Sequence, residues 1–167
     1  MKDGNKEDVL RIAVLPVFDG VSDQQSAFML RDKVQNALYF KGYPKITAQF
    51  VDEQLSAGPA KESDLQDKAE YSRVLGKQMH VDAILYCDLK ESRTNYYFIY
   101  SPLSVAADFE LRSAKSGQLL WRSTYSTIKR NYGMSKNSLW LKGVQDYETA
   151  IQELVDQAMK VFPDNSD

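Results

Sequence analysis

The stretch Ser113–Ser123, "SAKSGQLLWRS", joins small and charged residues to an apolar run that ends in Trp121. Gly117 can take the positive φ of a tight turn between antiparallel strands at little steric cost. Trp121 would then return into the core and bury a large apolar area. The stretch therefore predicts a β-hairpin, and nothing in it supplies catalytic chemistry.

The residues on both sides of this turn have the period of two that strands require. Before the turn, apolar residues alternate with polar or small ones, and after it every second residue shares a face. Before the turn, one face has Val105, Ala107, Phe109 and Leu111, and the other face has Ala106, Asp108, Glu110 and Arg112. After the turn, the residues that share a face are Trp121, Ser123, Tyr125 and Thr127.

Three earlier segments also have strand character. The runs "RIAVLPVF" (11–18) and "VDAILYCDLK" (81–90) are almost continuously apolar, as strands covered on both faces are. A shorter segment, "KITAQFV" (45–51), is a further predicted strand, and the polar stretch 52–63 after it reads as a linker with its turn at Gly58-Pro59.

Three segments have the spacing of amphipathic helices. The first begins at a Ser22/Gln25 capping box and is stopped by Gly42 and Pro44, and the second begins at a Ser63/Gln66 capping box. The third is C-terminal and ends at Pro163. Their apolar stripes are Ala27, Leu30, Val34, Ala37 and Leu38; Leu65, Ala69, Ser72, Leu75 and Met79; and Tyr147, Ile151, Leu154, Val155, Ala158 and Phe162.

The predicted order is β-α-β-α-β-β-β-α, a single α+β domain in which helices pack on a mixed sheet. We expect this domain to span residues 11–163, between a polar lead (1–10) and a polar tail (164–167). With 167 residues, the chain can form one domain with a proper core. Its net charge of -2 gives no general attraction to nucleic acid or anionic membrane.

The strands and the hairpin together resemble a signature of bacterial envelope lipoproteins. In that family a "GADAVLY" strand precedes a "DLRTGQLLW" hairpin; here "HVDAILYCDL" and "LRSAKSGQLLWRS" stand in the same order, after a "VLP" strand at 14–16. His80 stands where the family usually has Gly. The chain resembles the lipoprotein family related to the curli-secretion lipoprotein CsgG. The resemblance implies a fold similar to the TolB N-terminal domain and to LpoB.

The resemblance also implies a location. It implies an N-terminal lipid anchor on a cysteine absent from this chain, and a place in the periplasm, anchored to the outer membrane. The polar lead has no hydrophobic signal region. Two interpretations of it stay open: a cytoplasmic protein, or a mature secreted chain to which Met1 was added.

The residues that usually carry chemistry point to structural roles. His80 is the single histidine and follows a helix, where a left-handed cap is expected. Cys87 is the single cysteine and lies in a buried strand. Asp82 and Asp88 are too far apart along that strand for an acid/base pair, and strand-end solvation or a lysine partner explains them. We therefore predict no catalytic residues, no cofactor and no metal.

Two aromatic segments are candidate interfaces. "RTNYYFIYSPL" (93–103) lies between strands, with Pro102 expected to break the second one, and "KRNYGMSKNSLWLKG" (129–143) is expected to be a long connection. The alternative for both is that the aromatics close the core. The candidate interface residues are Tyr96, Tyr97, Phe98, Tyr100, Leu139 and Trp140.

Two classes of function follow. The first is a non-enzymatic envelope lipoprotein that binds other envelope proteins or itself in a transport, secretion or assembly system. The second is a cytoplasmic ligand- or RNA-binding module, because the scaffold resembles anticodon-binding domains. The negative net charge and scattered basic residues oppose RNA binding, which needs a positive stripe.

Overall fold

The computed structural model describes residues 9–17, 24–59, 66–93, 100–132 and 136–165. Within these ranges it describes side chains except at 91–93, 100–103, 131–132 and 136–146. The elements follow the order β1-α1-α2-α3-β2-β3-β4-α4. Their bounds are β1 Ile12–Val14, α1 Gln24–Phe40, α2 Ala48–Ala57, α3 Lys68–Met79, β2 Ala83–Arg93, β3 Tyr100–Ser113, β4 Leu119–Tyr132 and α4 Lys136–Lys160.

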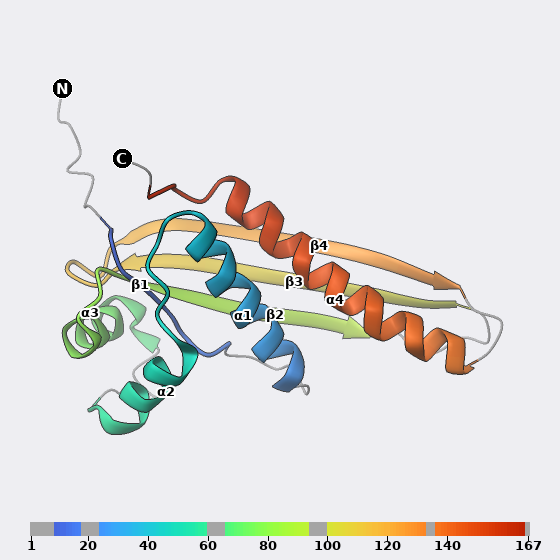
Figure 1. Ribbon diagram of the computed structural model, residues 1–167, viewed down its shortest axis with the longest axis horizontal. Coiled ribbons are helices and arrows are strands. Elements are labelled where there is room, and N and C mark those ends of the chain that lie inside the picture. The colour runs from blue at the N-terminus through green and yellow to red at the C-terminus, as the bar shows by residue number, and fades with distance from the viewer. Residues whose placement is uncertain (1–8, 18–23, 60–65, 94–99, 133–135, 166–167) are drawn as a thin grey trace.

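The strands form one mixed sheet in the order β1-β2-β3-β4 (Figure 1). β1 is parallel to β2, whereas β2, β3 and β4 are successively antiparallel. The parallel pair needs a long crossover, which α1, α2 and α3 provide. The predicted single α+β domain with helices on a mixed sheet is therefore confirmed.

Two apolar cores lie on opposite faces of the sheet. Alternate residues along β1 and at its end explain this: Ile12 and Val14 belong to the larger core, whereas Ala13 and Leu15, which directly follows the strand, belong to the smaller one. Helices α1 and α4 cover the larger core, and α4 crosses the strands diagonally (Figure 1). Helices α2 and α3 cover the smaller core beside β1 and β2. The prediction that the first strand is buried on both faces is confirmed.

The predicted hairpin is present, and its turn also contacts a helix. Gly117 has φ +76°, and its N–H donates to the Ser113 carbonyl at 2.9 Å. A Cβ atom at this position would lie 2.5 Å from the Ala69 carbonyl oxygen at the start of α3. Gly117 is thus required both by the turn and by the close approach of α3.

The predicted strand 45–51 is wrong, because α2 begins within it at Ala48. The hydroxyl of Thr47 accepts a hydrogen bond from the Phe50 N–H at 3.3 Å, which caps the helix. Val51 is then turned into the smaller core. The β-branched residues that suggested a strand instead cap and anchor a helix, which also contains 52–57 of the expected linker.

The predicted capping box of the second helix is also wrong. Helix α3 begins at Lys68, and Asp67 caps it by accepting from the N–H groups of Ala69 and Glu70. A carboxylate at this place also interacts favourably with the helix dipole. Ser63 of that predicted box, and Ser22 of the first one, lie outside the described residues. The left-handed cap predicted at His80 is confirmed, with φ 52° and ψ 52°.

Trp121 is only half-buried, which corrects its expected place inside the core. It lies on β4, which is at the edge of the sheet, so none of the described strands covers its outer side. Its inner side packs on the larger core, with ring centroids 4.9 Å from Phe162 and 6.4 Å from Phe109. The hairpin therefore returns Trp121 to the margin of the core.

Two expected irregular segments are largely regular. Pro102 does not break its strand, because β3 begins at Tyr100 and β2 pairs with it only as far as Leu103. The N–H that Pro102 lacks is therefore not needed toward β2. The expected connection 129–143 contains the end of β4 and, from Lys136, the first turns of α4.

Candidate interaction surface

The face of the sheet opposite α1 and α4 is covered only in part. Helix α3 packs on it beside Ile84 and Tyr86 of β2. Farther along the strands most side chains on this face are polar, and most are half-buried or exposed. We call this set the polar sheet face: Asp88, Lys90, Ala106, Asp108, Glu110, Arg122, Thr124, Ser126 and Ile128.

The strand register sets these residues in three rows. Tyr86 is opposite Glu110, which is opposite Arg122; Asp88 is opposite Asp108 and then Thr124; Lys90 is opposite Ala106 and then Ser126. Residues directly opposite on one face have Cβ atoms about 4.5–5.5 Å apart, so each row brings its side chains into contact.

Glu110 is the centre of the polar sheet face. Only 7% of its side chain is exposed, and it accepts a hydrogen bond from Arg122 at 2.6 Å and another from Arg112. Lys68 of α3 lies 3.5 Å away. Burial alone would raise the pKa of Glu110, but the hydrogen bonds from Arg122 and Arg112 and the charge of Lys68 hold that pKa below its usual value.

Asp88 and Asp108 face each other across β2 and β3, an unfavourable pair of like charges. Hydrogen bonds from Lys90 at 2.7 Å and Thr124 at 2.7 Å lower the pKa of Asp108. Partial burial raises the pKa of Asp88, although Lys68 at 3.7 Å opposes this. Asp88 is therefore the weaker acid of the two. A lysine partner, one of the two explanations expected for Asp88, is therefore present.

Lys68 connects this network to the smaller core. Its ammonium lies 5.0 Å from the centre of the Tyr86 ring, a cation–π distance. The Tyr86 hydroxyl is 2.9 Å from Ser72 Oγ, and burial raises the pKa of Tyr86 to about 12. Tyr86 therefore stays protonated and supports the packing of α3 on the sheet.

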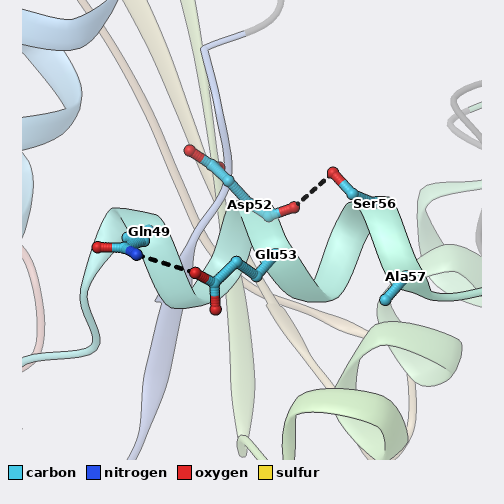
Figure 2. Close-up of a pocket in the computed structure, with 5 residues that line it drawn as sticks. All are labelled: Gln49, Asp52, Glu53, Ser56 and Ala57. Carbon is cyan, nitrogen blue, oxygen red and sulfur yellow. Dashed lines mark hydrogen bonds between the residues drawn. The ribbon is translucent and has the colours of Figure 1, made fainter.

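A shallow depression on α2 is a second candidate binding surface (Figure 2). Gln49, Asp52, Glu53, Ser56 and Ala57 line it, and all belong to one helix. Figure 2 shows Gln49 bonded to Glu53, at 2.9 Å, and Ser56 bonded to the Asp52 carbonyl, at 2.9 Å. The Asp52 carboxylate is held by Arg31 at 2.8 Å. Its polar side chains already have partners, and no nucleophile and base meet there.

The remaining candidates from the sequence have structural positions. Cys87 is fully buried, and burial strongly raises the pKa of its thiol. Asp82 accepts hydrogen bonds from the N–H groups of Leu10 and Arg11, at 3.1 and 2.8 Å, and so fixes the entry into β1. Within the described ranges, no three His, Cys, Asp or Glu side chains are grouped so that they could hold a metal ion.

The predicted interface residues fall mostly outside the description. Tyr96, Tyr97 and Phe98 lie outside the described residues. The backbones of Tyr100, in β3, and of Leu139 and Trp140, in α4, are placed, but their side chains lie outside the description. The structure therefore describes no side chain of the six predicted interface residues Tyr96, Tyr97, Phe98, Tyr100, Leu139 and Trp140.

The sequence did not single out the polar sheet face. The signal was present in the alternation of Ala106, Asp108, Glu110 and Arg112 between apolar residues. That pattern indicates a strand with one polar face, but it does not show which residues from other strands and from α3 gather on it. Only the register and the position of Lys68 show this.

Comparison with known proteins identifies the fold. A family model described as "Putative lipoprotein GNA1162-like" matches residues 6–167. Among solved structures, the lipoprotein GNA1162 from Neisseria meningitidis is similar with a TM-score of 0.61 and 19% identity, over 83% of this chain and 96% of that one. No curated protein matches in sequence.

Two more distant structures have the same fold. A minor lipoprotein from Acinetobacter baumannii is similar with a TM-score of 0.53 and 11% identity, over 91% of this chain and 90% of that one. A PelC dodecamer from Paraburkholderia phytofirmans is similar with a TM-score of 0.51 and 12% identity, over 89% of this chain and 86% of that one. Among the described residues of this chain, no helix combines the length and the apolar character that crossing a bilayer requires.

Proposed function

This chain belongs to the GNA1162-like lipoprotein family, and on that premise we propose that it is a non-enzymatic component of the bacterial cell envelope. It is held at the periplasmic side of the outer membrane by an N-terminal lipid and acts by binding other envelope proteins or itself. The family match carries the proposal. A relation to CsgG and a role in secretion, transport or assembly belong to the same proposal.

The polar sheet face supports a binding role. Its charged groups are arranged as ion pairs, and the Asp108 carboxylate is bonded to both Lys90 and Thr124. Arg122 and Lys90 keep 59% and 70% of their side chains exposed, so both can meet a partner's polar groups. Such a surface favours recognition of a protein over conversion of a substrate.

The aromatic segments are a second part of the proposed binding role. Tyr100 pairs with Tyr132, so the segments that lead to and from these two residues join the sheet at the same end. Tyr, Phe and Trp anchor interfaces because they bury much area with few rotatable bonds. The PelC structure is a dodecamer, which supports self-association on this fold.

Fatty-acid labelling tests the location. The full coding sequence would be expressed in its own bacterium with an alkyne fatty acid, and the envelope would be fractionated. We expect label on the protein and recovery with outer membranes. The matched control is this chain expressed from Met1, which should stay unlabelled because Cys87 is its single cysteine and is fully buried. An unlabelled full-length protein in the cytoplasm would instead favour the ligand- or RNA-binding alternative.

Single substitutions test the aromatic segments. Tyr97, Phe98 and Trp140 would each be changed to Ser, with partner capture and urea midpoint measured on every variant. Loss of association at an unchanged midpoint supports an interface. A lowered midpoint with association intact in the folded fraction would show that these aromatics close the core.

A further inference from the structure

Strand β4 has an unusually long free edge. All of its fourteen residues except Leu120 pair with β3 on one side, and in the described part of the chain no strand pairs with the other side (Figure 1). Alternate backbone N–H and C=O groups of such a strand point outward and are available to another strand. The opposite edge is β1, which has three residues. Beyond Leu85, as far as Arg93, β2 also lacks a strand partner on that side, so β4 is the longer of two free strand edges among the described elements.

The composition of β4 does little to block this edge. The strand has neither Gly nor Pro and is rich in Ser, Thr and Tyr. Its one irregularity is the register shift beside Leu119 and Trp121, at the start of the strand. Two of its cations are held beside the edge by carboxylates: Arg122 by Glu110 at 2.6 Å and Lys129 by Glu153 at 2.5 Å.

Exposed apolar residues lie near both ends of the strand. Leu120 is 39% exposed and Ile128 is 61% exposed. Ile128 is opposite Ser104, a small residue, so the sheet itself does little to cover it. Counting alternate residues from Arg122 places Ile128 on the polar sheet face. Leu120 has no partner in β3, because the register shifts between Leu119 and Trp121. Covering both at once requires a partner with apolar residues at a matching spacing.

We propose that this partner is a second copy of the chain, paired antiparallel through β4 about a two-fold axis at Thr124. In this register Leu120 of each copy is opposite Ile128 of the other, and Arg122 is opposite Ser126. Both exposed apolar residues are covered by one contact, repeated twice by symmetry. The two sheets become continuous, with both α4 helices on the same face. The inference deepens the proposed interaction role and rests on it.

Neighbouring registers are less favourable. An axis at Ser126 would place Arg122 opposite Arg130 twice, and like charges directly opposite are destabilising. An axis at Tyr125 would place Arg122 opposite Ile128 and Arg130 opposite Leu120, so each apolar side chain would meet a guanidinium. The charges and apolar residues of β4 therefore favour an axis at Thr124 over these two registers.

Disulfide cross-linking tests both the pairing and its register. In Thr124→Cys the two new thiols would be directly opposite, with Cβ atoms about 4.5–5.5 Å apart, close to what a disulfide needs. In the matched control Ser126→Cys, on the same face and also exposed, the thiols would be about 13 Å apart. Cys87 is fully buried, so it does not compete for oxidant.

We expect Thr124→Cys to form a reducible dimer under mild oxidation and Ser126→Cys to remain monomeric on the same gel. Equal or stronger cross-linking of Ser126→Cys would overturn the register. Circular dichroism checks the fold of Thr124→Cys, because Thr124 donates to Asp108.

Sedimentation of the unsubstituted protein provides the second measurement. We expect a monomer–dimer equilibrium that Ile128→Glu weakens by about tenfold or more, since it places a carboxylate against Leu120. A protein that sediments as a monomer at every concentration would overturn the pairing. These results do not depend on lipid attachment, so a failed fatty-acid experiment and a failed pairing are separate outcomes.

Discussion

At the scale of single residues, Glu110 and Asp88 show how one charged network shifts the pKa values of two acids in opposite directions. Glu110 is nearly buried but meets two guanidinium groups and a lysine, so its carboxylate is favoured. Partial burial raises the pKa of Asp88, Lys68 at 3.7 Å opposes this, and the facing Asp108 adds to the rise. Position on the strand, and not residue type, decides which acid stabilises the fold.

The pH dependence of stability should therefore differ between the two acids. The folded-state pKa of Glu110 is lowered, so its stabilisation is complete above the ordinary carboxyl pKa of about 4.3 and is lost as pH falls through the folded-state pKa. We expect Glu110→Gln to lose about 1–3 kcal/mol at neutral pH and to approach the unsubstituted protein under acid conditions.

Asp88→Asn is the comparison for this prediction. The folded-state pKa of Asp88 is raised, so its ionisation costs stability as pH rises through that pKa. The variant should have a urea midpoint equal to or above that of the unsubstituted protein at neutral pH. Urea midpoints of both variants across the acid range measure the effect. A lower midpoint for Asp88→Asn at neutral pH would contradict the assignment.

At the scale of elements, Arg31 joins three of them. Its side chain is 3% exposed, and its guanidinium donates to the Val14 carbonyl of β1 at 3.1 and 3.0 Å and to Asp52 of α2 at 2.8 and 3.0 Å. Helix α1 is thereby fixed to both β1 and α2. Because the depression on α2 is lined by Asp52, Arg31 also sets the shape of that surface.

Removing this connection should destabilise the fold. We expect Arg31→Met to lose about 2–4 kcal/mol, because the Val14 carbonyl and Asp52 lose their donor, with Asp52 partly rehydrated. Arg31→Lys should recover little, since a single ammonium cannot reproduce the planar fork. Chemical denaturation measures both. The control is Lys33→Met, two residues away on α1, and an equal loss there would show that the effect is not specific to Arg31.

At the scale of the whole molecule, the two cores share one sheet. Residues of β1 and β2 alternate between them, so neither core can separate while the sheet is intact. The helices of each core are also linked, α1 to α2 through Arg31 and Asp52. We therefore expect residues 11–163 to unfold as one cooperative unit.

Two matched core substitutions test this cooperativity. Leu75→Ala removes a fully buried side chain from the smaller core and Leu154→Ala removes one from the larger core, each at a cost of about 2–5 kcal/mol. Far-UV circular dichroism and tryptophan fluorescence should give coincident transitions in both variants. Separate transitions in the Leu75→Ala protein would show that the α2–α3 side is an independent unit.

The sequence by itself determined the elements whose pattern is local. Alternating side chains predicted β3 and β4, and continuous apolar runs predicted β1 and β2. Gly117 and His80 predicted the turn and the helix cap, because a positive φ depends on the residue that adopts it. It failed at 45–51, where β-branched residues resemble a strand but Thr47 caps a helix. Thus, local propensity did not determine the element there.

Tertiary structure alone decided the rest. Whether Trp121 is buried depends on β4 being at the edge of the sheet, and the charge state of Glu110 depends on Arg122 and on Lys68, which lies far from it in sequence. The same is true of the free edge along β4. These properties arise from the order of strands and from contacts between distant residues, and a single sequence does not record either of them.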